Sequence, residues 1–403
     1  MADLTTFQES VQSIGVDAWV LYDFRGTNSL AHSILGVPSD AHCTRRWMVV
    51  IPAHGTPIKV MHKMERDHLS HLQWTDQLYS THSEWTNVVK EALAPYHTLA
   101  MEYSPNNSIP VVSKVDAGTI EMIRGLGHVV VSSGNIAQQF TSVLTNEQID
   151  EAVTAGQTLR SIIIAAFTLI RDSLKGGKTI TEYAVQQFIL QSFEANNMET
   201  DSVPIVAIGV NAAMPHYAPS SSRSSDITDD MVVLIDSWAK YRKPGAVFAD
   251  LTWVGYTSDI VPSNVADMFD VIVRARDAAV SIVRDRFDSK QPICGYEVDD
   301  ACRRVVADAK LGEYFIHRTG HNITTEIHGP GVNMDDFETH DERLILPGMC
   351  FSVEPGVYKQ GMIGLRTEID VIVHHDGTIN IPSEPIQRHI IPLLAQDWMS
   401  QCC

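Results

Sequence analysis

The first third of the chain alternates between short apolar runs and stretches of helical periodicity. Runs rich in β-branched and aromatic residues predict strands, and apolar residues recurring every three or four positions predict amphipathic helices. The expected strands are 16–23, 47–61, 98–103 and 128–133, and the expected helices are 5–15, 64–72, 84–93 and 109–127. The run 47–61 is divided near Gly55, which is typical of a hairpin. The alternation indicates a domain of mixed α/β type.

The pattern changes at Thr145, where a long helical region begins. Thr145 and Gln148 have the spacing of a capping box, in which each side chain bonds the backbone N–H of the other residue. Helical periodicity continues to about residue 174, and a second helix is expected to end near residue 195. We therefore predict two domains, 1–143 and 144–403.

Two apolar runs in the second domain predict a hairpin of long strands. The runs 231–241 and 247–257 are separated by a turn that contains Pro244, and they carry Asp236 and Asp250. Antiparallel pairing of these strands would place the two aspartates near one another.

Two later apolar runs, 350–358 and 364–373, are also expected as strands and carry Glu354 and Glu368. Helices are expected at 262–289 and 296–310, between the two pairs of strands. A carboxylate inside a run of Val, Ile and Phe is costly to bury unless something pairs with it. The acidic residues of these runs therefore need a partner.

A metal site would supply that partner. Each acidic residue taken alone fits a turn or a surface position, but four of them in four apolar runs, close to a histidine cluster, are hard to explain by chance. Carboxylates with one imidazole suit Mn²⁺ or Co²⁺ better than zinc alone, and two bridged ions can activate water and polarise a carbonyl. The candidate ligands are Asp236, Asp250, His321, Glu354 and Glu368.

Composition and charge limit the binding partners and the cellular location that we expect. The 403 residues carry a formal charge of −19, which argues against nucleic acid and against anionic membrane surfaces. The first residues have neither a basic stretch nor an apolar segment, and we expect no secretory signal and no membrane span. The six cysteines are scattered without CxxC spacing, which favours reduced thiols in a cytoplasmic protein.

The motifs of the second domain resemble those of the creatinase/aminopeptidase P/methionine aminopeptidase superfamily, peptidase family M24. LPGMCFSVEPGVY at 346–358 and GLRTEID at 364–370 match family motifs, and the five candidate ligands match the family's metal ligands in order. The chain is most similar to Xaa-Pro peptidases, meaning prolidase and aminopeptidase P. The resemblance implies an α+β fold, with a pita-bread metallohydrolase domain after a smaller α/β creatinase-like domain. It also implies two divalent ions, Mn²⁺ first and Co²⁺ or Zn²⁺ as alternatives.

The same resemblance implies roles for further residues. His216 would contact the substrate near the scissile amide, His328 would bond its carbonyl, and His317 would line the proline pocket. Glu354 would be both a metal ligand and the group that passes a proton from the bridging water to the leaving proline nitrogen. The residues implied as outer support for the metal ligands are Thr252, Tyr358 and Arg366.

The implied substrate is a small peptide with proline in the second position, cleaved by a homodimer. Prolidase activity on dipeptides is the first reading, and aminopeptidase activity on longer peptides stays open. A lyase of the dimethylsulfoniopropionate type and a binding module without catalysis are the rival readings. The spacing of Asp236 and Asp250 is longer than usual in the family, and Asn322, Thr324 and Thr325 replace smaller or apolar residues. These departures concern the shape of the substrate pocket.

Overall fold

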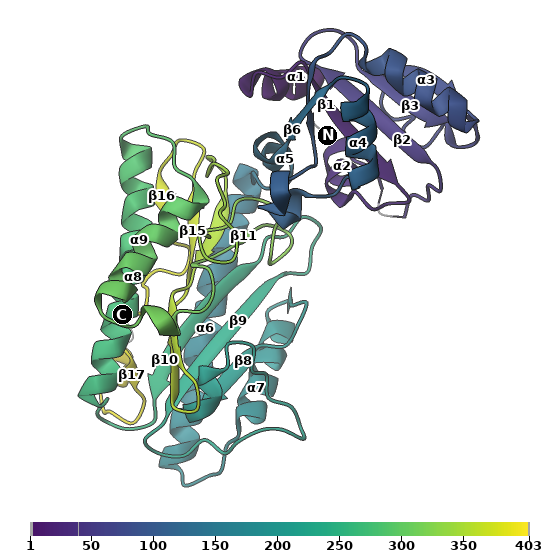
Figure 1. The fold of residues 1–403 in the computed structure, drawn as a ribbon. Coiled ribbons are helices and arrows are strands. Elements are labelled where there is room, and N and C mark those ends of the chain that lie inside the picture. Colours follow the sequence, from purple (N-terminus) through teal and green to yellow (C-terminus); the bar gives the residue numbers. More distant parts are fainter. Residues whose placement is uncertain (1–2, 39, 402–403) are drawn as a thin grey trace. The chain divides into compact units, whose positions relative to one another are not determined.

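The chain folds into two compact units, Met1–Thr141 and Ser142–Cys403. They are seen in a computed structural model that describes residues 3–38 and 40–401 (Figure 1). Each unit buries hydrophobic clusters of its own. Cys43, Cys294, Cys302 and Cys350 are free thiols, and the adjacent Cys402 and Cys403 lie outside the described residues.

A six-stranded mixed sheet forms the centre of the first unit, in the order β4-β3-β2-β1-β5-β6. Its strands are β1 (Ala18–Phe24), β2 (Arg46–Pro52), β3 (Ile58–His62), β4 (Thr75–Tyr79), β5 (Thr98–Met101) and β6 (Val129–Ser132). The helices are α1 (Leu4–Ser13), α2 (Ser29–Leu35), α3 (His82–Leu93), α4 (Ala117–Gly125) and α5 (Gly134–Thr141). Trp19 and Leu21 enter one core cluster and Val20 and Tyr22 the other, so both faces of β1 are buried.

The expected hairpin at 47–61 is present, since β2 and β3 pair antiparallel. The helix expected at 64–72 is wrong, because only a short 3₁₀ turn, Lys63–Glu65, forms and turns follow it. The helix expected at 109–127 begins only at Ala117, where Asp116 caps it. We did not predict α2, α5 or β4, which are short and depend on neighbours for their burial.

The second unit contains a larger set of elements (Figure 1). Its main helices are α6 (Asn146–Lys175), α7 (Glu182–Ala195), α8 (Ser263–Asp288) and α9 (Gly295–Asp308). Its strands are β7 (Met198–Glu199), β8 (Ile205–Ile208), β9 (Val232–Tyr241), β10 (Ala249–Tyr256), β11 (Asn322–Ile323), β12 (Cys350–Val353), β13 (Gly356–Lys359), β14 (Ile363–Arg366), β15 (Ile369–Val373), β16 (Ile379–Asn380) and β17 (Ile391–Pro392). The capping box predicted for the start of α6 is present at Thr145 and Gln148.

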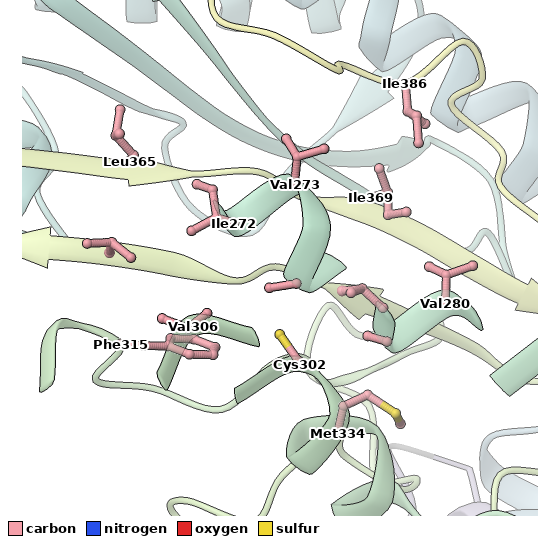
Figure 2. Packing of buried hydrophobic residues seen from close by; sticks show 14 of the residues in the cluster. Ile272, Val273, Val280, Cys302, Val306, Phe315, Met334, Leu365, Ile369 and Ile386 are labelled. Atoms are coloured by element: carbon pink, nitrogen blue, oxygen red, sulfur yellow. The ribbon is translucent and has the colours of Figure 1, made fainter. Parts of the chain in front are cut away.

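Three sheets share this unit. The first has the order β17-β10-β9-β7 with β8 also paired to β9, the second has the order β11-β12-β15-β16, and the third is the ribbon β13-β14. Helices α6 and α7 pack with β9 and β10 in one cluster, and α8 and α9 pack with β12, β14 and β15 in another. Figure 2 shows the second cluster, with Ile272 and Val273 of α8 close to Leu365 and Ile369 of the strands.

Helix α6 is long and apolar enough to span a membrane, judged by length and composition alone. It is the one such helix among the described residues. Its apolar side chains, including Leu159, Ile163, Phe167 and Ile170, are buried in the cluster formed with β9 and β10. The hydrophobicity of α6 is therefore that of a helix packed in a protein core.

Candidate active site

The antiparallel strands β9 and β10 bring the two aspartates together, as the hairpin pattern predicts. Asp236 lies opposite Thr252, and Asp250 lies opposite Trp238. The aspartates are therefore diagonal neighbours on one face of the sheet. Both carboxyl groups are almost fully buried, and the residues around them on the two strands are mainly apolar.

The two glutamates lie at breaks in strands, and the prediction that they lie inside strands is wrong. Glu354 lies between β12 and β13, and Glu368 lies between β14 and β15. Because β12 pairs with β15 and β13 pairs with β14, both breaks occur at the same level of one long hairpin. The interruption releases backbone groups from the ladder, and Glu354 N donates instead to Thr319 O and Glu368 N to Thr252 O.

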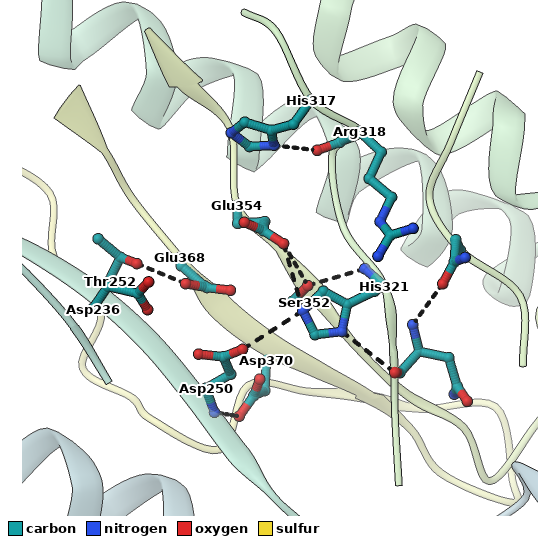
Figure 3. A network of polar contacts seen from close by, with 12 residues as sticks. Asp236, Asp250, Thr252, His317, Arg318, His321, Ser352, Glu354, Glu368 and Asp370 are labelled. Atoms are coloured by element: carbon teal, nitrogen blue, oxygen red, sulfur yellow. Dashed lines mark hydrogen bonds and ion pairs between the residues drawn. The ribbon is translucent and has the colours of Figure 1, made fainter. Parts of the chain in front are cut away.

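His321 joins the two pairs of carboxylates (Figure 3). Its Nε2 lies 3.6 Å from Asp250 Oδ2 and 3.5 Å from Glu354 Oε1. Ligand atoms of Asp250, His321 and Glu368 all lie within 4.8 Å of one another. Gly320 allows the backbone beside His321 to pass close to Ser352 of β12, since a Cβ at position 320 would lie 1.9 Å from Ser352 O.

Burial gives these carboxyl groups unusual acidities. It raises the pKa of Asp250 and Glu368 well above the ordinary value, and neighbouring carboxylates raise it further. Burial likewise raises the pKa of Asp236, and it raises that of Glu354 to about 7. Four acidic groups in a small buried volume repel one another when ionised, so this site favours a cation.

The remaining donors fit the same conclusion. Burial lowers the pKa of His321 well below its ordinary value, so its imidazole is neutral and has a free lone pair. Asp250 Oδ1 is buried and has no hydrogen-bond partner among the described residues. Oxygen donors with one imidazole are typical ligands of Mn²⁺ and related ions, so the residues present fit the metals that the motifs imply.

A chain of hydrogen bonds supports the carboxylates from behind. Thr252 Oγ1 donates to Glu368 Oε2 at 2.6 Å and accepts from Arg366 Nε at 2.9 Å. Arg366 also pairs with Asp236, and its Nη1 donates to Tyr358 OH at 3.3 Å. Tyr358 OH in turn lies 2.9 Å from His317 Nε2. The three residues expected as outer support therefore form one network with a histidine expected to line the pocket.

The other two histidines lie at the edge of this group. The ring of His328 packs edge-on against that of His321, with 4.3 Å between centroids. His216 is exposed. His328 thus contacts the core of the site, and His216 lies on the solvent side.

Comparison with known proteins identifies the family. The model of metallopeptidase family M24 matches residues 153–375, which is more than half of the chain and contains every site residue described above. The chain belongs to metallopeptidase family M24.

Relatives of this M24 protein include peptidases with curated names. It is 28% identical over 268 residues to the probable dipeptidase PepE of Mycobacterium tuberculosis, a match that covers 66% of this chain and 66% of PepE. It is 29% identical over 214 residues to the Xaa-Pro dipeptidase of Lactobacillus delbrueckii subsp. lactis, with 53% of each chain covered. The aligned region thus spans just under two thirds of PepE and about half of the Xaa-Pro dipeptidase.

Solved structures agree with the pita-bread fold. Dipeptidase PepE from Mycobacterium ulcerans superposes with a TM-score of 0.69 at 25% identity, over 96% of both chains. The Xaa-Pro dipeptidase from Bacillus anthracis superposes with a TM-score of 0.60 at 17% identity, over 96% of this chain and 98% of that one. The α+β fold expected for the second unit of this M24 protein, with a smaller α/β unit before it, is therefore confirmed.

The structure of this M24 protein adds residues that we did not single out. Asp370 Oδ2 accepts from Asp250 N at 3.0 Å, and burial raises the Asp370 pKa to about 8. Its position two residues after Glu368 in an apolar run was the available signal. Ser352 Oγ accepts from His321 N at 3.0 Å, and no sequence pattern indicated it.

A cavity of about 600 Å³ opens beside the site of the M24 protein. Its lining is Glu199, Thr200, Asp201, Lys240, Phe248, Thr325, Glu326, Ile327 and His328. Because His328 also packs on His321, the cavity borders the buried donors and is large enough for a small peptide.

Proposed function

We propose that this M24 protein hydrolyses Xaa-Pro bonds of small peptides, first of all dipeptides. The observation that carries the proposal is the convergence of buried carboxylates on one neutral imidazole, which suits divalent cations and little else. The names of the M24 relatives, dipeptidase and Xaa-Pro dipeptidase, support the choice of substrate. The residues that would hold two ions, Mn²⁺ in the first place, are Asp236, Asp250, His321, Glu354 and Glu368.

Such ions lower the pKa of water, orient a carbonyl group and offset negative charge that develops on its oxygen. The chain supplies the proton transfers. Glu354 would take a proton from water and give it to the leaving proline nitrogen. His328 would donate a hydrogen bond to the scissile carbonyl, and His216 would contact the substrate near the same amide.

His317 would face the proline ring. Burial lowers its pKa to about 3, so the imidazole is neutral, and its Nε2 is held at 2.9 Å from Tyr358 OH. A neutral ring that is fixed by hydrogen bonds can form one wall of an apolar pocket without attracting ions. The tertiary Xaa-Pro amide needs such a dedicated pocket, because proline has no N–H for a general peptidase to bind.

We also infer that the first unit, Met1–Thr141, is a creatinase-like domain, that the protein forms a homodimer, and that it works in the cytoplasm. The sheet and helices of this unit fit the first inference. Sedimentation of the full chain tests the second, and fractionation of producing cells tests the third.

The experiment that tests the activity is a peptide panel. Chelated protein is assayed with Ala-Pro, Gly-Pro, Ala-Ala and Ala-Pro-Ala before and after addition of Mn²⁺. Cleavage of Ala-Pro and Gly-Pro that is restored by metal, without cleavage of Ala-Ala, supports Xaa-Pro hydrolysis. Failure to cleave any of the proline peptides with metal bound would refute it.

A further inference from the structure

Glu182, in the first turn of α7, is a buried acidic residue that the proposed chemistry does not use. Its side chain is 0% exposed, and it has no ion-pair partner within 3–38 and 40–401. A buried carboxylate without a cation is costly unless hydrogen bonds satisfy its oxygens. The four donors that do so are Ile208 N at 2.9 Å, Asn211 Nδ2 at 2.9 Å, Tyr217 OH at 2.6 Å and Ser225 N at 2.9 Å.

All four donors lie in one segment, 208–225, which runs from the end of β8 through the 3₁₀ turn Gly209–Ala213 to Ser225. His216, which the proposed function places near the scissile amide, lies within this segment. Glu182 Oε1 accepts from the two donors that precede His216, and Oε2 accepts from the two that follow it. One carboxylate therefore holds the segment on both sides of the histidine.

Backbone pairing fixes both ends of the segment 208–225. Before it, β8 pairs antiparallel with β9, and Ile205 lies opposite the proposed ligand Asp236. At its end, Ser225 O accepts from Glu182 N at 3.1 Å. The part between these ends, which contains His216, is held by the Glu182 side chain.

The same segment also packs against the strand that leads to the metal ligands. A Cβ at Gly364 of β14 would lie 1.7 Å from Ala212 O, so the two backbones are in direct contact. Strand β14 ends at Arg366, just before the proposed ligand Glu368. The segment 208–225 thus contacts both Glu182 and the supports of the metal site.

Tyr217 links Glu182 most directly to His216, because it is the next residue along the chain. Its ring is buried in the cluster that contains α8 and α9, and its hydroxyl donates to Glu182 Oε2. Burial, and after it the Glu182 carboxylate, raises the Tyr217 pKa, so the hydroxyl keeps the proton that it donates. His216 is exposed and makes no hydrogen bond in the part of the chain that the structure describes. Its position is therefore set by its neighbours.

We propose that Glu182 is a positioning residue, which holds His216 where it contacts the substrate. The inference rests on the proposed Xaa-Pro hydrolysis and on the role of His216 in it. A shift of about 1 Å in a group that contacts the substrate can lower the rate by about 100-fold, even when its cause lies far from the reacting atoms. Loss of the Glu182 carboxylate should therefore lower activity through His216 and leave the metal ligands unaffected.

A double-mutant cycle with Ala-Pro and Mn²⁺ tests this dependence. Glu182→Gln is expected to lower kcat/KM by roughly 10- to 100-fold, because an amide group replaces one acceptor oxygen with a donor that faces other donors. His216→Ala should lower kcat/KM by at least as much. Addition of Glu182→Gln to His216→Ala should lower it further by less than about threefold, since the group that Glu182 positions is already gone.

Metal binding separates positioning from a general loss of structure. Mn²⁺ should raise the Tm of Glu182→Gln by about as much as that of the wild type, since the proposed ligands are unchanged. Glu147→Gln is the matched control, because Glu147 is exposed and carries the same charge in the first turn of α6. It should keep wild-type activity.

Tyr217→Phe provides the same test if Glu182→Gln does not fold, since it removes one hydroxyl and keeps the buried ring. It should lower kcat/KM by roughly 3- to 10-fold when His216 is present and by less than about twofold in His216→Ala.

Wild-type activity of Glu182→Gln or of Tyr217→Phe, an additive loss in either cycle, or loss of the Mn²⁺ effect on the Tm of folded Glu182→Gln would each overturn the role of Glu182. Full activity of His216→Ala would overturn it as well. All of these results would leave Xaa-Pro hydrolysis standing. Cleavage of no proline peptide by the metal-loaded wild type would overturn both proposals.

Discussion

At the scale of single residues, the site holds buried carboxyl groups that are costly to ionise. Burial and mutual repulsion raise the pKa of Asp250 and Glu368, so the metal-free protein holds protons or strain that a cation relieves. The proposed metal ligands should therefore destabilise the fold when no metal is bound. Stability and function are opposed at these positions.

Asp250→Asn exposes this opposition. We expect the metal-free variant to be at least as stable as the wild type, because one of four buried acidic groups has been neutralised. Addition of Mn²⁺ should raise Tm in the wild type but not in the variant, and activity should fall by about 10³-fold or more. Thermal unfolding with and without Mn²⁺ measures both effects. Asp259→Asn, at an exposed carboxylate just after β10, should respond to metal like the wild type.

At the scale of elements, strong local patterns were predictable and tertiary effects were not. The capping box of α6 and the β9–β10 hairpin follow from nearby residues alone, and both are present. Each arm of the long hairpin is divided between two sheets, because β12 pairs with β15 in one sheet and β13 pairs with β14 in another. Glu354 and Glu368 lie at these divisions, and no single run of residues reveals them. The proposed ligands could be recognised in the sequence, whereas the hydrogen bond from His321 N to Ser352 Oγ arises only through folding.

Helix α9 anchors the segment 317–321 through Asp299. Its two carboxylate oxygens accept from Thr319, from Arg303 Nε at 2.7 Å and from Asp336 N at 2.8 Å, and Arg303 in turn donates to the carbonyls of Phe315 and His317. Asp299→Ala should lower the free energy of unfolding by about 2–4 kcal/mol, because it leaves Arg303 and several N–H groups unpaired. Urea unfolding measures this loss. Asp300→Ala, at the exposed neighbour, should change stability by less than about 1 kcal/mol.

The turn after β3 predicts a pH effect in the first unit. Partial burial would raise the pKa of Glu65, but bonds from Cys43 Sγ, Thr44 and Arg45 N outweigh it and lower the pKa to about 2. A depressed carboxyl pKa stabilises the folded state above the ordinary value of 4.5, and this contribution is lost as pH falls toward 2.

Glu65→Gln should therefore destabilise the first unit at pH 7 by about 1–2 kcal/mol, reduced from the full value by solvent screening, and by much less near pH 2. Denaturant unfolding at several pH values between 2 and 7 measures the difference. Glu91→Gln, at an exposed position of α3, is the control and should show no such trend. A difference between Glu65→Gln and wild type that is constant with pH would contradict the assignment.

At the scale of the whole molecule, the chain has two units with separate cores, and the proposed metal ligands lie in only one of them. All proposed metal ligands lie in Ser142–Cys403, and none lies in Met1–Thr141. Calorimetry should then resolve two unfolding transitions, and Mn²⁺ should raise the Tm of only the one that belongs to the second unit. At a concentration 100 times its Kd, Mn²⁺ should raise the free energy of unfolding of that unit by about 2.7 kcal/mol. A single transition whose Tm rises with Mn²⁺ would instead show that the units unfold together.

The order of the ligands along the chain has a consequence for protein synthesis. Asp236 and Asp250 are made first, but Glu354 and Glu368 lie more than a hundred residues later, and the edge of β10 is completed only by β17 at Ile391–Pro392. Contacts between such distant segments form late in folding. A nascent chain on the ribosome would therefore hold an incomplete ligand set, and peptidase activity would begin only once translation had passed the last of these strands.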